Sequence, residues 1–69
     1  MPNAAQEAKS DFTRAELSMC HHQSWMMTFQ AACMRRDWEA AEKAREGVLG
    51  SMDSFMDNFI AGHKRMESA

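Results

Sequence analysis

Apolar residues recur along the chain at alternating spacings of three and four residues, the pattern of a helix with one apolar side. In the first half this register holds Ala5, Ala8, Phe12, Ala15, Met19, His22, Met26, Phe29 and Cys33. In the second half it holds Trp38, Ala41, Arg45, Val48, Met52, Phe55, Phe59, Gly62 and Met66. Between them, Asp37 is suited to cap a new helix. The pattern predicts a single domain over 1–69, with a helix over about 4–34, a turn at 35–37 and a helix over about 38–66.

The start of the first helix and the middle of the second each allow two interpretations. Asn3 is a candidate N-cap for an early start, whereas Thr13 with Glu16 fits a capping box for a later one. The apolar register already holds from residue 5, which favours the early start. Gly47 and Gly50 weaken the second helix. A kink or break near Gly47–Ser51, giving three helices, is therefore the alternative to one continuous helix.

A second apolar stripe on the first helix predicts self-association. It consists of Leu17, Cys20, Ser24, Met27, Ala31 and Met34. At about 100° per residue it points roughly 150° away from the first register, so one partner helix cannot cover both. Two hairpins that form a four-helix bundle would bury the surplus apolar surface, and a homodimer is expected. The residues expected at the dimer interface are Leu17, Cys20, Met27, Ala31, Met52, Phe55 and Phe59.

The small residues of the second helix form a stripe of their own. Its members are Ala40, Ala44, Gly47, Ser51 and Ser54. Side chains of this size at helical spacing indicate a close approach of the two helices.

Composition narrows the class of protein. The single Pro is at position 2, and the abundance of Ala, Met, Glu, Gln, Lys and Arg favours helix almost everywhere, so the fold class is all-α. Eight basic against ten acidic residues leave a formal net charge of −2, which argues against nucleic-acid binding. No apolar stretch is long enough to span a bilayer, and no signal-peptide pattern is present. We expect a cytoplasmic protein without a membrane partner.

The residues that most resemble a chemical site are better explained structurally. Consecutive side chains such as Cys20, His21 and His22 diverge by about 100° on a helix and do not converge on one metal ion. His21 is expected to point to solvent and His22 towards the partner helix. Cys20 and Cys33 lie roughly 20 Å apart on one helix, beyond disulfide reach. With no phosphate-binding loop and no convergent nucleophile, we expect a protein that is not an enzyme and holds no metal or cofactor.

The turn end carries the residue types that dominate protein-binding surfaces: Trp, Arg and Met. Each has a plainer alternative, since the tryptophans can pack on each other across the turn, the arginines can be solvated turn residues and the methionines can fill a core. The candidate partner-binding residues are Trp25, Met27, Met34, Arg35, Arg36 and Trp38.

The whole chain resembles the phage-encoded anti-quorum-sensing anti-activators. The resemblance is carried by its length, its two-helix pattern, its Met-rich faces and the run from Ser10-Asp11-Phe12-Thr13 to His63-Lys64-Arg65-Met66. It implies an inhibitor, active in the host bacterial cytoplasm, that binds a LuxR-type quorum-sensing transcription factor and blocks its DNA binding. It also implies a second target, the type IV pilus assembly ATPase. The alternatives are a small dimeric nucleic-acid-binding protein of the ROP type and a structural adaptor subunit.

Overall fold

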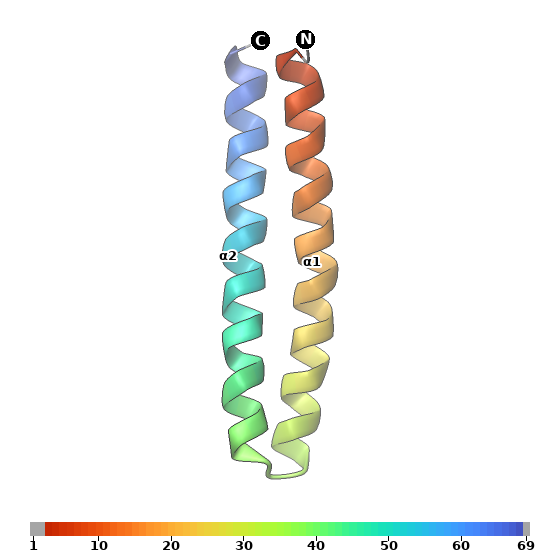
Figure 1. Cartoon of the computed structure of the whole chain (residues 1–69), viewed down its shortest axis with the longest axis vertical. Coiled ribbons are helices and arrows are strands. Elements are labelled where there is room, and N and C mark those ends of the chain that lie inside the picture. Colours follow the sequence, from red (N-terminus) through yellow and green to blue (C-terminus); the bar gives the residue numbers. More distant parts are fainter. Residues whose placement is uncertain (1–2, 69) are drawn as a thin grey trace.

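The computed structural model describes residues 3–68, so the two ends of the predicted domain, residues 1–2 and 69, lie outside the described part. It contains two helices, α1 (Ala4–Met34) and α2 (Trp38–Ser68), each 31 residues long. They run antiparallel as a rod of 50 × 15 × 13 Å, with both termini at one end, here called the open end (Figure 1). The predicted all-α hairpin is confirmed, and residues 3–68 contain no strand. Neither helix has a stretch apolar enough to cross a membrane within this range.

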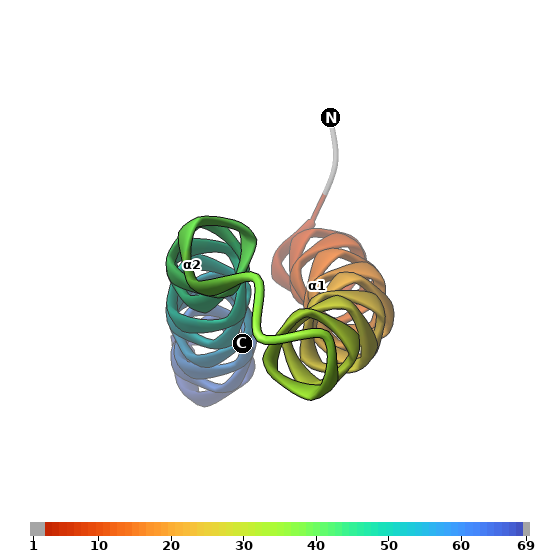
Figure 2. The ribbon, with the colours of Figure 1, turned by 90° about the horizontal axis from the view of Figure 1, so that it is seen from below.

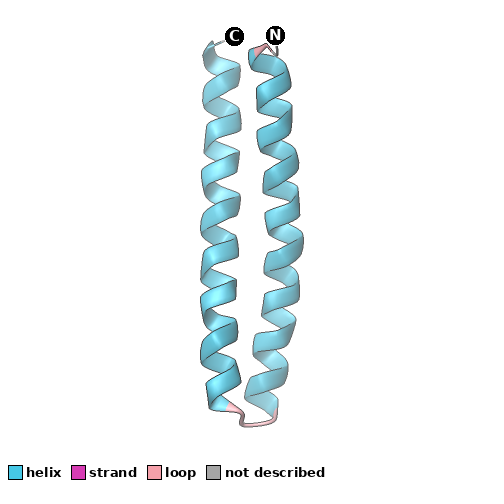
Figure 3. Ribbon diagram, in the orientation of Figure 1, coloured by secondary structure: helices cyan, strands magenta, loops and turns pink. Residues whose placement is uncertain are grey.

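Three residues suffice for the turn because they complete one helix and start the next (Figure 3). The Arg36 N–H donates to the Cys33 carbonyl at 3.0 Å and the Asp37 N–H to the Ala32 carbonyl at 2.9 Å, the pairing of a Schellman motif. Arg36 has φ 59°, the left-handed conformation that glycine usually supplies here. The Asp37 carboxylate then accepts from the Ala40 N–H at 3.2 Å and caps α2.

The structure decides where the first helix begins and whether the second is continuous. The Asn3 side chain accepts from the Gln6 N–H at 2.9 Å, so α1 begins at Ala4 and passes through Thr13 without a break. The Thr13 hydroxyl instead donates back to the Lys9 carbonyl at 3.0 Å. The second helix is continuous across Gly47–Ser51, so the three-helix alternative is excluded.

The seam between the helices is built from small residues, and this corrects the predicted apolar register. On α1, Ala8 and Ala15 are buried as predicted, but at three other predicted positions the residue just before is buried instead. These buried residues are Asp11, Ser18 and Ala32, whereas Phe12 and Met19 are only half-buried. The predicted stripe of small residues on α2 faces α1, and helices this close leave no room for long side chains between their backbones. The buried residues are Ala8, Asp11, Ala15, Ser18, Ala32, Ala41, Ala44 and Gly62.

The displaced large side chains gather on one side of the seam, here called the apolar flank. Phe12 of α1 meets Phe59 of α2 on this side, and Met26 and Arg45 line one pocket on it nearer the turn. Seven-residue spacing places the other members in the same two columns. The apolar flank comprises Phe12, Met19, Met26 and Cys33 of α1 with Trp38, Arg45, Met52, Phe59 and Met66 of α2. Viewed along the rod, each helix packs only on the other, so the described part of the chain has no third element to cover this flank (Figure 2).

Candidate protein-interaction surfaces

The second apolar stripe of α1, from Leu17 to Met34 and here called the outer stripe, lies fully on the surface. Leu17 is 55% exposed, Met27 70% and Met34 85%. Cys20 and Ala31, the smaller members between them, are also exposed. The prediction that one hairpin cannot bury both apolar sides of the first helix is therefore confirmed.

Near the open end, the apolar flank holds a cluster of aromatic rings. Phe12 packs edge-on against Phe59 with centroids 5.6 Å apart, and Phe55 stacks on Phe59 at 5.4 Å. The His63 ring contacts both Phe12 and Phe59, at 5.2 and 4.7 Å. Phe12 also lies over Gly62, where a Cβ atom would come within 2.7 Å of the ring. Although packed together, the cluster still leaves Phe59 44% exposed.

Nearer the turn, the apolar flank contains a small pocket. Its volume is about 100 Å³, and its lining is apolar throughout. The residues that line it are Met26, Phe29, Arg45, Val48 and Leu49. Trp38, seven residues before Arg45 on the same column, is 61% exposed.

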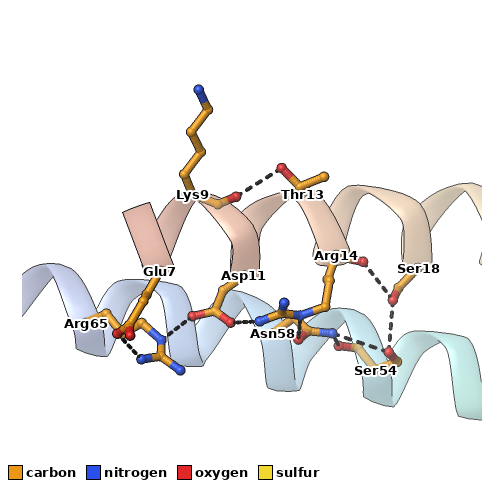
Figure 4. Close-up of polar contacts among 9 residues, drawn as sticks. All are labelled: Glu7, Lys9, Asp11, Thr13, Arg14, Ser18, Ser54, Asn58 and Arg65. Atoms are coloured by element: carbon orange, nitrogen blue, oxygen red, sulfur yellow. Dashed lines mark hydrogen bonds and ion pairs between the residues drawn. The ribbon is translucent and has the colours of Figure 1, made fainter. Parts of the chain in front are cut away.

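The opposite side of the seam, here called the polar flank, carries a network of charges around Asp11 (Figure 4). Asp11 is 2% exposed, and its carboxylate accepts from Arg14 and, at 2.6 Å, from Arg65. Arg65 also donates to Glu7 at 2.6 Å, and Arg14 donates to Asn58 at 3.4 Å. Two guanidinium groups therefore compensate the one buried carboxylate, which makes its burial tolerable.

The network holds Arg65 in its charged form. The hydrogen bond to Asp11 and the charge of that carboxylate raise the pKa of Arg65 above its ordinary value, and Glu7 adds to the effect. An arginine is already protonated at every physiological pH. The cluster is thus a structural clamp between the helices near the open end.

Further along the polar flank, the contacts are neutral. The Ser18 and Ser54 hydroxyls lie 2.9 Å apart. One heptad nearer the turn, the Trp25 ring covers Gly47 so closely that a Cβ there would lie 2.2 Å from the indole. Within the seam, His22 Nδ1 lies 3.1 Å from the Val48 carbonyl, which confirms the predicted inward orientation of this histidine.

The six predicted partner-binding residues do not form one surface. Met34, Arg35, Arg36 and Trp38 are exposed and lie together at the turn end. Met27, by contrast, belongs to the outer stripe of α1.

Trp25 lies apart from Trp38. Trp25 contacts Gly47, which lies two positions after Arg45 and therefore about 200° around α2 from it. Trp25 is thus on the polar flank, whereas Trp38, in the same column as Arg45, is on the apolar flank. The alternative in which the two tryptophans pack on each other is therefore excluded.

The predicted dimer residues also separate into two groups. Leu17, Cys20, Met27 and Ala31 are on the outer stripe of α1. Met52, Phe55 and Phe59 lie on or beside the apolar flank, where Phe55 stacks on Phe59.

No group of three or more His, Cys, Asp or Glu side chains is placed to hold a metal ion within residues 3–68. Cys20 is an exposed free thiol and Cys33 a half-buried one.

Sequence reasoning missed two features. The pairing of Asp11 with Arg65 joins residues 54 positions apart, and apolar periodicity contains no signal for it. The pocket beside Arg45 did have a signal, because Arg45 is the one cation in a column of otherwise apolar residues. Comparisons with protein-family models, with curated proteins and with solved structures give no match for this chain.

Proposed function

We propose that this chain is a non-enzymatic inhibitor that acts by binding another protein. The observation that carries the proposal is the distribution of apolar side chains. Most of the buried residues of the seam are alanine, serine or glycine, while Met27, Met34 and Trp38 remain more than half exposed. Apolar patches of this kind on a small protein mark interaction surfaces. Methionine is suited to such a role because its flexible, polarizable side chain adapts to a partner's shape.

The proposed target is a LuxR-type quorum-sensing transcription factor, with the type IV pilus assembly ATPase as a second target. Both come from the resemblance to the phage anti-activators. The charge of the chain is compatible with the first, since a net charge of −2 complements a basic DNA-binding surface. Covering that surface would block DNA binding by direct competition.

We further propose that the chain acts as a homodimer through the outer stripe of α1. Its small members, Cys20, Ser24 and Ala31, would allow two copies of α1 to approach closely, and Leu17 and Met27 would supply apolar contact. The apolar flank then remains available for the target. In this arrangement Met52, Phe55 and Phe59 would lie outside the dimer interface.

A mobility-shift assay with a LuxR-type regulator bound to its promoter DNA tests the function. The wild-type protein is expected to release the regulator from the DNA and to bind no DNA itself. Trp38→Ala should lose this effect because it removes an exposed aromatic anchor. It should remain dimeric, because the Trp38 side chain lies outside the seam and the proposed dimer interface. Glu46→Gln, an exposed change on the outer side of α2, is the matched control and should release the regulator as the wild type does.

Two results would contradict the proposal. If the wild-type protein leaves the regulator on its promoter, this target is wrong. If the protein shifts the DNA without the regulator, a nucleic-acid-binding dimer replaces the inhibitor. Full inhibition by both Trp38→Ala and an Arg35→Ala/Arg36→Ala double variant would move the binding site from the turn end to the helix faces.

A further inference from the structure

The pocket on the apolar flank has the size and lining of a receptor for one side chain. An apolar cavity of roughly 150 Å³ in a protein interior holds a benzene molecule. The pocket here is smaller, about 100 Å³, and is lined by apolar atoms only. A single aliphatic side chain, such as that of leucine, isoleucine or methionine, suits this space better than an aromatic ring.

The rim of the pocket carries a charge that the hairpin does not neutralise well. Arg45 lines the pocket with its aliphatic stem, since the lining exposes no polar atom. Its guanidinium lies 3.7 Å from Glu42, and both side chains are largely exposed, at 64% and 74%. An exposed ion pair of this kind contributes little, because water screens both charges. The guanidinium therefore remains available to a carboxylate that approaches from above the pocket.

The apolar residues around Arg45 make the pocket selective for partners that carry an acidic group. The positions one heptad before and after it in the same column are Trp38 and Met52, both apolar. A partner surface that is purely apolar would bury the guanidinium without a counter-charge, which is costly. A partner with a carboxylate beside its apolar anchor gains a charge-assisted hydrogen bond instead.

We propose that this pocket receives an aliphatic side chain from an amphipathic helix of the target protein, with an acidic residue one helical turn away that pairs with Arg45. An amphipathic helix commonly binds with its apolar face in a hydrophobic groove and presents its anchors three or four residues apart. The proposal rests on the protein-binding function and specifies the chemistry of the segment that is bound.

Selection from a displayed library of helical peptides tests the proposal. The library keeps one helical scaffold and randomises one face. Peptides enriched on the wild-type hairpin are expected to combine Leu, Ile or Met with Asp or Glu three or four positions away. Enriched peptides without this pair would overturn the proposal, and so would a selection that enriches none.

Substitutions then locate the contact in the hairpin. Arg45→Glu should weaken the best peptide at least tenfold, and Val48→Phe, which fills the pocket, should do the same, whereas Glu46→Gln should have no effect. Melting curves check that each variant is folded. A peptide whose acidic residue is changed to Lys should bind Arg45→Glu better than it binds the wild type. Equal binding of that peptide to both proteins would contradict the charge pairing.

NMR spectra of the methyl groups show where the peptide binds. Its addition should shift the signals of Met26, Val48 and Leu49, while shifts confined to Leu17 and Met27 would place it on the outer stripe and overturn the proposal. If the pocket signals shift with protein concentration in samples without peptide, the occupant is a second copy of the chain, and the proposal is also overturned. The promoter-release assay is independent: release without peptide binding at the pocket refutes only this inference, and peptide binding without release refutes only the proposed target.

Discussion

Alanine substitutions at Gly47 and Gly50 are expected to differ in their effect on stability, with a gain at Gly50 only, although the two residues lie less than one turn apart on α2. In a helix interior, Ala is more favourable than Gly by about 1 kcal/mol. Apart from the adjacent residues and the backbone of α2 itself, nothing lies within 4 Å of the place where a Cβ would stand on Gly50, so Gly50→Ala should gain that full amount.

At Gly47 the same Cβ would lie 2.2 Å from Cδ2 and 2.4 Å from Cε2 of Trp25, where ordinary contact begins at 3.4 Å. These atoms belong to the middle of the indole, so the whole ring must move. Overpacking of this kind costs about 1–3 kcal/mol, which cancels or exceeds the helical gain. Gly47→Ala should therefore be less stable than Gly50→Ala by about 1–3 kcal/mol.

Thermal unfolding followed by circular dichroism measures the difference. For a domain of this size, 1 kcal/mol corresponds to about 4–8 °C in Tm. Protein concentration must be equal for all variants, because self-association raises the apparent stability. In a Trp25→Ala background the obstacle is gone, and Gly47→Ala should become stabilising. If Gly47→Ala stabilises the wild-type hairpin as much as Gly50→Ala does, the indole does not occupy the space over Gly47.

Three further outcomes follow from the surfaces and the seam. Met27→Glu should weaken the dimer at least tenfold in light scattering while Glu42→Lys changes it little; a wild-type monomer at micromolar concentration would contradict the dimer. His22→Glu should cost about 1–3 kcal/mol, because it places a carboxylate beside the Val48 carbonyl, whereas His21→Glu on the exposed side should stay within about 0.5 kcal/mol in the same melting experiment. A chelator should leave helicity and Tm unchanged, and elemental analysis should find no stoichiometric zinc; a sharp fall in Tm would reveal a structural metal.

The hairpin itself could be predicted because its signals are local. Asn3 and Asp37 are residues that cap helices, and both do so. Apolar spacing also identified the exposed stripe on α1. These inferences depend on residues within one or two turns of each other, which a sequence displays directly.

The composition of the seam could not be predicted from apolar spacing. That spacing places Phe12 and Met19 between the helices, but the small residues of α2 bring the backbones too close for them. Asp11 takes a buried position instead, because Arg65, far away in the sequence, compensates its charge. From the sequence, Gly47 indicates either a kink or, as a member of the small-residue stripe, a close approach of the helices. The structure shows the second, with the Trp25 ring over Gly47.

The two rings that rest on glycines also prevent the helices from sliding along each other. Phe12 fits over Gly62 near the open end, and Trp25 fits over Gly47 nearer the turn. A longitudinal shift by one turn, about 5.4 Å, in either direction would move the Phe12 ring off Gly62 and onto residues that carry side chains. The axial register of the two helices is therefore fixed, and groups on α1 and α2 keep their positions relative to each other along the rod. A target that bridges both helices meets a preorganised surface and loses little affinity to ordering it.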